Sequence, residues 1–234
     1  MDLKTAKVLV TGGSSGIGYS TALLLRDRGA AVAICGRKAD ALDEAATELG
    51  ALGIVADVSR EDDVRRMVER VTSELGGYNV LINNAGFGSW GSLVETTEAD
   101  FRRVWETNVL GAMLVARESA KFFVKQGSGN IVNVASTAGQ RGYAGGTAYV
   151  STKFALSGMT ECWRAELRKH NVRVMQVNPS EVQTNFFASA GKPRSTNETK
   201  LMGEDIAHAI CSMLAMEDRG FVTEATVWAT NPKD

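Results

Sequence analysis

A tyrosine and a lysine four residues apart are the residues here whose types and spacing best suit catalysis. Tyr149 and Lys153 fall in a helical pattern that begins at Ala148, so both side chains project from one face, about a turn apart. A phenol titrates near about pH 10, but a neighbouring ammonium favours the phenolate and lowers the pKa. We therefore expect Tyr149 to have a lowered pKa and to act as a general acid or base.

A serine follows the apolar run Ile131 to Val134 and is a third candidate. Ligands of open parallel sheets bind outside the carboxyl ends of the strands, which places Ser136 on the ligand side. A hydroxyl there can hydrogen-bond a substrate oxygen and orient it toward the phenol of Tyr149. The alternative is a serine that only caps a loop.

A glycine-rich turn, Thr11-Gly12-Gly13-Ser14-Ser15-Gly16-Ile17-Gly18, stands between an apolar run and a helical pattern from Tyr19 to Arg28. Glycines let the backbone approach a pyrophosphate closely, and the N-terminus of a helix attracts its negative charge. Many tight turns carry glycines for positive φ alone, so this segment by itself leaves both interpretations open.

The end of the second apolar run indicates which dinucleotide is bound. An acid at this place accepts hydrogen bonds from a ribose 2′-hydroxyl and repels a 2′-phosphate. Here the run ends in Cys35-Gly36-Arg37-Lys38, without an acid. A guanidinium can form two hydrogen bonds to a phosphate, so Arg37 favours NADP over NAD; the alternative is a solvated surface arginine.

The elements that must position these residues alternate along the chain. Helical patterns such as Glu61 to Leu75 separate short apolar runs that suit strands covered on both faces. The runs are Lys7 to Val10, Ala31 to Cys35, Gly53 to Ala56, Val80 to Ile82, Ile131 to Val134, Val172 to Val177 and Ala225 to Ala229. This alternation predicts one α/β domain over residues 1–234, a Rossmann fold with a doubly wound parallel sheet of about seven strands and helices on both faces.

Composition excludes several other classes. The 26 basic and 27 acidic side chains give a net charge of -1, so we expect no nucleic-acid or membrane partner. Only two histidines, His170 and His208, and three scattered cysteines are present, so neither a catalytic Ser/His/Asp triad nor a metal site is expected. The start MDLKTAKVLV resembles no signal peptide, and no apolar run reaches 18 residues, so we expect a cytoplasmic protein.

Together these motifs resemble the short-chain dehydrogenase/reductase family over nearly the whole chain. Asp57-Val58 looks like the family's adenine-contacting strand end, and Asn83-Asn84-Ala85-Gly86 is similar to its segment beside the adenine and ribose. The family's catalytic tetrad is matched, including the 13-residue step from serine to tyrosine, by Asn108, Ser136, Tyr149 and Lys153.

The resemblance implies a role for each of these residues. Tyr149 would be the general acid in reduction, Ser136 would orient the carbonyl, and Lys153 would bind the nicotinamide ribose and depress the pKa of the tyrosine. Asn108 would hold the main chain of its helix open for a water that relays protons to Lys153. The residues implied to bind NADP(H) are Gly12, Ser14, Ser15, Gly16, Ile17, Gly18, Arg37, Asp57, Val58, Asn84, Ala85, Gly86, Tyr149, Lys153, Pro179, Val182 and Thr184.

Two features depart from the family pattern. Ser180 stands where the family has glycine after Asn178-Pro179, which puts the local turn in question. The segment Phe221 to Asp234 lacks the glycine-rich ending of many members, which puts a standard tetramer in question. We still expect a homodimer or homotetramer, because apolar residues from Phe154 to Met159 cover more than one helix face. Family members commonly pair through this helix and the one at Glu98 to Gln126.

The function that follows is an NADP(H)-dependent oxidoreductase, a carbonyl reductase or a relative of the 3-oxoacyl-acyl-carrier-protein reductases. Two alternatives remain: an NAD-dependent polyol or sugar-alcohol dehydrogenase, and a non-catalytic NADP(H)-binding sensor or scaffold. Aromatic residues around the tetrad favour an apolar or aromatic carbonyl substrate, whereas an arginine in the same region could select an acidic one. These candidate substrate residues are Phe87, Trp90, Arg141, Tyr143, Phe186 and Phe187.

Overall fold

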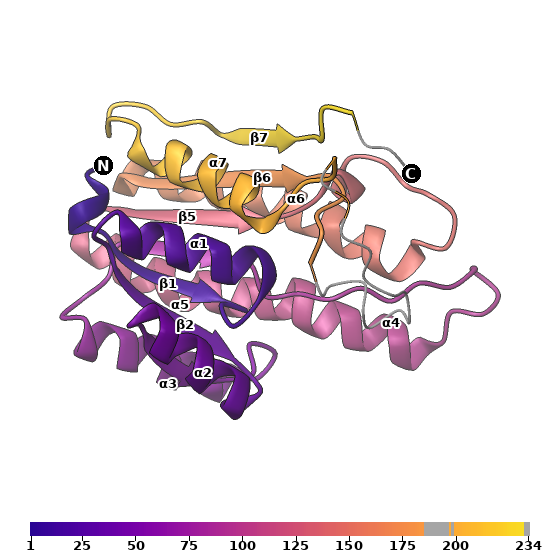
Figure 1. Cartoon of the computed structure of the whole chain (residues 1–234), viewed down its shortest axis with the longest axis horizontal. Helices are drawn as coiled ribbons and strands as arrows, with labels where there is room; N and C mark the ends of the chain where they lie inside the picture. The colour runs from indigo at the N-terminus through magenta and orange to yellow at the C-terminus, as the bar shows by residue number, and fades with distance from the viewer. Residues whose placement is uncertain (185–196, 198, 232–234) are drawn as a thin grey trace.

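The structure is a computed structural model that describes residues 1–184, 197 and 199–231. Seven parallel strands form one sheet in the order β3-β2-β1-β4-β5-β6-β7 (Figure 1). The strands are β1 Lys7–Thr11, β2 Ala31–Gly36, β3 Leu52–Val55, β4 Val80–Asn83, β5 Gly129–Val134, β6 Val172–Pro179 and β7 Glu224–Val227. All seven predicted runs are therefore strands, with ends shifted by at most two residues.

Helices cover both faces of this sheet, as predicted. They are α1 Gly16–Asp27, α2 Ala39–Leu49, α3 Glu61–Glu74, α4 Glu98–Trp105, α5 Ala112–Gln126, α6 Thr147–Leu167 and α7 Gly203–Ala215. The side chains of β1 alternate between the faces: Val8 and Val10 belong to the core under α1, α2 and α7, whereas Leu9 belongs to the core with α3 and α5. Both faces are buried, which explains why the strands are continuously apolar.

The chain from Glu98 to Gln126 is not one regular helix, although the sequence pattern gave no break. A π-helical turn, Glu106–Gly111, separates α4 from α5. Such turns widen the helix by one residue and often mark functional sites. Gly111 lies at the end of the turn, where a Cβ would come within 2.8 Å of Val58. The helix thus approaches the loop after β3 closely.

The strand order places the candidate site. The chain leaves β1 toward β2 and β3 on one side and returns to β4 on the other, so β1 and β4 are neighbours with opposite-running crossovers. This switch point opens a crevice at the carboxyl ends of the strands, where such sheets bind ligands. The glycine-rich turn after β1, the segment after β4 and the serine after β5 all meet at this edge.

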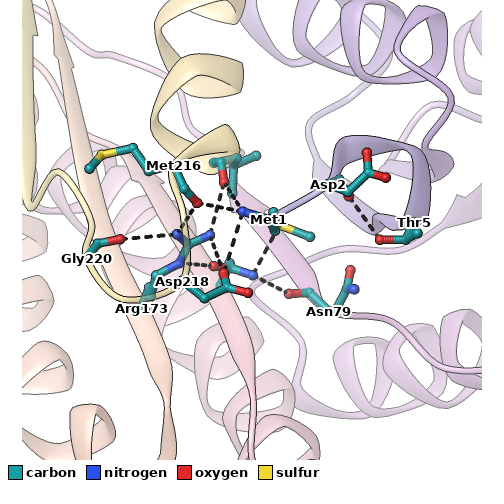
Figure 2. A network of polar contacts seen from close by, with 10 residues as sticks. Met1, Asp2, Thr5, Asn79, Arg173, Met216, Asp218 and Gly220 are labelled. Atoms are coloured by element: carbon teal, nitrogen blue, oxygen red, sulfur yellow. Dashed lines mark hydrogen bonds and ion pairs between the residues drawn. The ribbon is translucent and has the colours of Figure 1, made fainter.

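The opposite end of the sheet is tied together by buried Arg173 of β6 (Figure 2). Its guanidinium donates to Asn130 Oδ1 at 2.6 Å and to the carbonyls of Leu214 and Met216 at 3.0 and 3.1 Å. The amino group of Met1 donates to the same two carbonyls. Two cations therefore satisfy carbonyl groups at the C-terminus of α7 that the helix leaves unpaired.

None of the helices in the described part of the chain combines the length and apolar character that crossing a bilayer requires.

Candidate active site

Helix α6 presents Tyr149 and Lys153 to the carboxyl end of β5. Both side chains are buried, with exposed fractions of 8% and 6%. The Lys153 ammonium donates to the carbonyl of Val134 at 2.9 Å and lies 5.7 Å from the centre of the Tyr149 ring. The four-residue spacing thus brings phenol and ammonium together beside the last residue of β5.

Ser136 lies opposite Tyr149 at the start of a short 3-10 helix, Thr137–Gly139. Its hydroxyl accepts from the Ala138 amide at 3.1 Å and hydrogen-bonds Tyr149. A Cβ on Gly139 would lie 2.9 Å from the Lys153 carbonyl, so the glycine lets this 3-10 helix pack directly on α6. The serine therefore caps a loop and also reaches the phenol, which combines the two interpretations drawn from the sequence.

The pKa of Tyr149 contradicts the sequence-based expectation. Burial raises this pKa above its ordinary value and outweighs the hydrogen bond from Ser136, while nearby Tyr143 raises it further. The expectation considered only the neighbouring ammonium and did not include the free energy of burying a phenolate. The structure therefore keeps Tyr149 protonated and makes its phenol a weaker acid than a solvated one.

Lys153 responds to burial in the opposite direction. Removing the ammonium from water lowers the pKa of Lys153 to about 8. Its hydrogen bond to the Val134 carbonyl keeps the charged form partnered. Lys153 can therefore carry or release a proton near neutral pH within this buried site.

Asn108 lies inside the π-helical turn, and its side chain joins three elements. The amide oxygen accepts from the Phe87 amide at 3.1 Å, and the amide nitrogen donates to the Phe87 carbonyl at 2.9 Å and to Thr152 Oγ1 at 3.1 Å. Thr152 in turn donates to the carbonyl of Tyr149. The main chain is widened at Asn108 by the π-helical turn, and the Asn108 side chain links the segment after β4 to the face of α6 that carries Tyr149 and Lys153.

The glycine-rich turn after β1 is packed so closely that two of its glycines have no space for a Cβ atom. A Cβ on Gly18 would lie 2.3 Å from the Gly12 carbonyl, and one on Gly13 would lie 2.6 Å from Ile34. Gly12 has φ +65, which L side chains rarely adopt. The turn therefore closes tightly above β1 and directs the first-turn amides of α1 outward, an arrangement that fits a pyrophosphate.

Asn84 and Thr11 hold this turn in place. The Asn84 side chain donates to the carbonyls of Thr11 and Gly12 at 2.9 and 3.3 Å. The amides of Asn84 and Ala85 both donate to the Thr11 hydroxyl at 3.0 Å. The segment after β4 thus supports the cofactor turn through its own hydrogen bonds, and Thr11 is a positioning residue that the sequence reasoning missed.

Arg37 and Asp57 lie at the far end of the crevice, after β2 and β3. Partial burial acts to raise the pKa of Asp57, but hydrogen bonds from Ser59 and the charges of Arg37 and Arg60 outweigh it and lower that pKa. The Asp57 carboxylate accepts from the Ser59 amide and hydroxyl. Asp57 therefore stays ionised and bound to its own loop, where buried Val58 follows it. The exposed side chain of Arg37 lies nearby.

The segment after β6 closes the other side of the crevice. Thr184 lies against the glycine-rich turn, because a Cβ atom on Gly16 would come within 3.2 Å of the Thr184 Cβ. Val182 is buried and bridges to Leu201. Ser180 stands where the family has glycine. Its φ is not positive, because Asn171 is the only described non-glycine residue with a positive φ, so the serine causes no backbone strain. The Ser180 amide donates to the carbonyl of Val227.

Two of the predicted substrate residues gather over Tyr149. The Trp90 ring lies 6.0 Å from the Tyr149 ring, and its indole N–H donates to the Tyr143 hydroxyl at 3.3 Å. Gly88 and Gly146 make room for them, because a Cβ on either would come within 2.7 Å of the Trp90 or Tyr143 ring. An aromatic wall therefore stands beside the catalytic phenol.

The structure places the other two described candidates, Phe87 and Arg141, against different partners. The centre of the Phe87 ring lies 6.0 Å from the guanidinium of Arg37, and the Asn108 side chain binds the backbone of Phe87. The Arg141 guanidinium lies 5.3 Å from the ring of Trp228, a residue that sequence reasoning missed. Phe186 and Phe187 lie outside the described residues.

Within the described ranges, no group of three or more histidine, cysteine or acidic side chains could hold a metal ion. The two histidines lie away from Tyr149: His170 ends the 3-10 helix before β6, and His208 is on α7.

Comparison with known proteins identifies the family. The model of the short chain dehydrogenase family matches residues 6–195. A 3-oxoacyl-acyl-carrier-protein reductase of Thermotoga maritima is 33% identical over 237 residues, 95% of each chain. Another curated relative is 35% identical over 192 residues, and the chain spans only 54% of that protein's length.

Solved structures agree with this assignment. An alcohol dehydrogenase from the archaeon Thermococcus sibiricus, complexed with 5-hydroxy-NADP, has a TM-score of 0.88 and 28% identity, covering 98% of this chain and all of that one. A 3-ketoacyl-acyl-carrier-protein reductase from Brucella melitensis, complexed with NADH, has a TM-score of 0.88 and 28% identity, covering 96% and 97%. The chain belongs to the short-chain dehydrogenase/reductase family, whose members are oxidoreductases that use a nicotinamide cofactor.

Proposed function

We propose that this protein is an NADPH-dependent reductase of ketones or aldehydes, working in either direction, with Tyr149 as the general acid or base. The observation that carries the proposal is the buried group of Ser136, Tyr149 and Lys153 at the carboxyl end of β5. This group lies beside a turn that fits a pyrophosphate, so a nicotinamide ring bound in the crevice would supply the hydride to the substrate carbon.

The residues of the chain supply the proton and the orientation. Ser136 Oγ donates a hydrogen bond to the carbonyl oxygen and places it against Tyr149 Oη. Tyr149 Oη, which is protonated at neutral pH, gives its proton to that oxygen as the carbon accepts the hydride. Lys153, with a pKa lowered to about 8, stabilises the phenolate that remains and can help to return a proton. Asn108 and Thr152 keep α6 in register with the segment after β4.

Preference for NADPH over NADH rests on Arg37. Relatives with this fold have been captured with either cofactor, so the fold alone does not choose between them. Here the end of β2 carries an exposed guanidinium, and Asp57, the acid that follows β3, is held by Ser59. A 2′-phosphate can accept two hydrogen bonds from Arg37, whereas a bare 2′-hydroxyl would find no carboxylate at this strand end.

The substrate class follows from the aromatic wall. Trp90 and Tyr143 stand beside Tyr149, so a carbonyl held by Ser136 and Tyr149 would place its substituents against these rings. Arg141 lies against Trp228, and a guanidinium over an indole face is already partly satisfied. We therefore propose an apolar or aromatic carbonyl substrate; a 3-oxoacyl thioester also presents such a ketone.

A cofactor-depletion screen tests this function directly. Purified protein is mixed with NADPH or NADH and with ketones, aldehydes, diketones and 3-oxoacyl thioesters, and the loss of absorbance of the reduced cofactor is followed. Turnover with NADPH on at least one carbonyl supports the proposal. Tight NADPH binding without turnover on any compound would instead favour a sensor or scaffold, and NAD-linked oxidation of polyols would favour a sugar-alcohol dehydrogenase.

We also propose that the protein is a homodimer. Phe154 of α6 and Leu110 of the π-helical turn expose 47% and 41% of their surface, and between α6 and α4 lies an apolar groove. The groove is lined by Trp105, Val109, Leu110, Met113 and Met159 along with Arg102 and Glu106. An apolar face of this kind favours an identical partner. Light scattering of the wild type and Phe154→Glu tests it: a dimer that becomes a monomer supports the proposal, and a wild-type monomer refutes it.

A further inference from the structure

Two guanidinium groups from distant parts of the chain converge on one aromatic ring. Arg103 of α4 lies 5.3 Å from the Phe87 ring centre, and Arg37 after β2 lies 6.0 Å from the same centre. Helix α4 projects past the carboxyl ends of the strands (Figure 1), and Arg103 of this helix reaches the Phe87 ring in the segment after β4. Two cations drawn to one ring repel each other, so they mark a place suited to an anion.

Each of the two arginines has an acid nearby, but the acid is shared or only weakly paired. Asp57 is engaged with Ser59 and is already acted on by Arg37 and Arg60. Asp100 pairs with Arg103 at 3.2 Å, but both side chains are exposed, and such an ion pair contributes little free energy. A phosphate dianion can therefore replace Asp100 as the partner of Arg103 at low cost.

Phe87 fixes the geometry between the two arginines. Its backbone amide and carbonyl are both bound by the Asn108 side chain, so the ring is anchored to the π-helical turn. The adjoining residue on α4, Arg102, pairs with Glu98 at 2.6 Å and lines the apolar groove on the outer side of the helix. Only Arg103 of this pair faces the crevice.

We propose that Arg103 is a second specificity-determining residue, which binds the 2′-phosphate of NADP(H) together with Arg37 across the Phe87 ring. This inference rests on the proposed use of NADPH and adds a residue from α4 to the recognition. Helix α4, which follows β4, would then bind the same phosphate as the loop after β2. Cofactor selection and the placement of Asn108 are linked through Phe87.

The test uses Arg102→Ala as a matched control for Arg103→Ala, because both arginines are exposed on α4 and each pairs with one acid. Calorimetry measures the dissociation constants of NADPH, NADH, adenosine 2′,5′-bisphosphate and 5′-AMP for both variants, Arg37→Ala and the wild type. We expect Arg103→Ala to weaken NADPH and the bisphosphate about tenfold, with NADH and 5′-AMP changed less than twofold. Arg103→Gln should behave like Arg103→Ala, and Arg102→Ala should leave all four constants unchanged.

The outcomes separate this inference from the proposed function. If Arg37→Ala weakens NADPH but Arg103→Ala behaves like Arg102→Ala, the inference fails and the proposed cofactor stands. Equal weakening of NADPH and NADH in Arg103→Ala would assign the residue a structural role and would also overturn the inference. A wild-type protein that binds NADH as tightly as NADPH would overturn both.

Discussion

Burial of Lys153 predicts that replacing it with methionine will change stability in a pH-dependent way. The pKa of Lys153 falls from an ordinary 10.5 to about 8 in the fold, so the unfolded chain binds more protons between these two values. Wild-type stability therefore rises with pH across that window, and the cost of burying the ammonium is present in full below pH 8. At 1.36 kcal/mol for each pKa unit, the cost is about 3 kcal/mol.

Lys153→Met removes this cost but leaves the Val134 carbonyl without its donor, which costs about 1–3 kcal/mol at any pH. The difference in free energy of unfolding between variant and wild type should therefore shift by about 3 kcal/mol, against the variant, from pH 7 to pH 10.5. Urea unfolding without cofactor, followed by circular dichroism, measures it. Lys125→Met, at an exposed position of α5, is the control and should show a constant difference. A difference for Lys153→Met that is equally constant would refute the reasoning.

Three further predictions concern the cofactor, the fold and the substrate. Arg37→Ala should weaken NADPH by about 1.5–3 kcal/mol, the scale of a hydrogen bond to a charged group, and NADH much less; calorimetry that finds equal losses contradicts it. Arg173→Met should lower the free energy of unfolding by about 1–3 kcal/mol, because Asn130 Oδ1 loses its donor while two carbonyls at the end of α7 keep only the Met1 amino group; urea unfolding that finds wild-type stability would contradict this. An aryl ketone should have a higher kcat/KM than a keto acid of similar size, and a keto-acid preference above about tenfold, or 1.4 kcal/mol, would indicate that Arg141 leaves Trp228 to bind the acid.

The strand pattern and the catalytic group were predictable from the sequence because both depend on local order. Short runs of Val and Ile between helical patterns specify strands buried on both faces, and the parallel order then brings their carboxyl ends together. Ser136 and Tyr149 meet because Gly139 lets the 3-10 helix pack on α6. The spacing of Tyr149 and Lys153 needs only the period of a helix.

Other features depend on tertiary surroundings that no local pattern records. The pKa of Tyr149 is raised because the fold buries the phenol, whereas the sequence shows only the neighbouring lysine. The Phe87 ring lies near Arg37 of a distant loop, and its backbone is bound by Asn108, 21 residues later, so its surroundings come from tertiary contacts. Trp228 meets Arg141 only because β7 lies beside β6. Gly88 and Gly146 leave room for the rings of Trp90 and Tyr143, a packing constraint that the sequence alone does not show.

The central claim is that Tyr149 supplies the proton in carbonyl reduction. The most direct measurement compares kcat of the wild type and Tyr149→Phe on the best substrate of the depletion screen, with the NADPH dissociation constant of both determined in parallel. General acid catalysis typically contributes at least about a hundredfold in rate, so kcat should fall by that factor or more while NADPH affinity stays nearly unchanged. A folded Tyr149→Phe protein that binds NADPH and retains the wild-type kcat would contradict the claim.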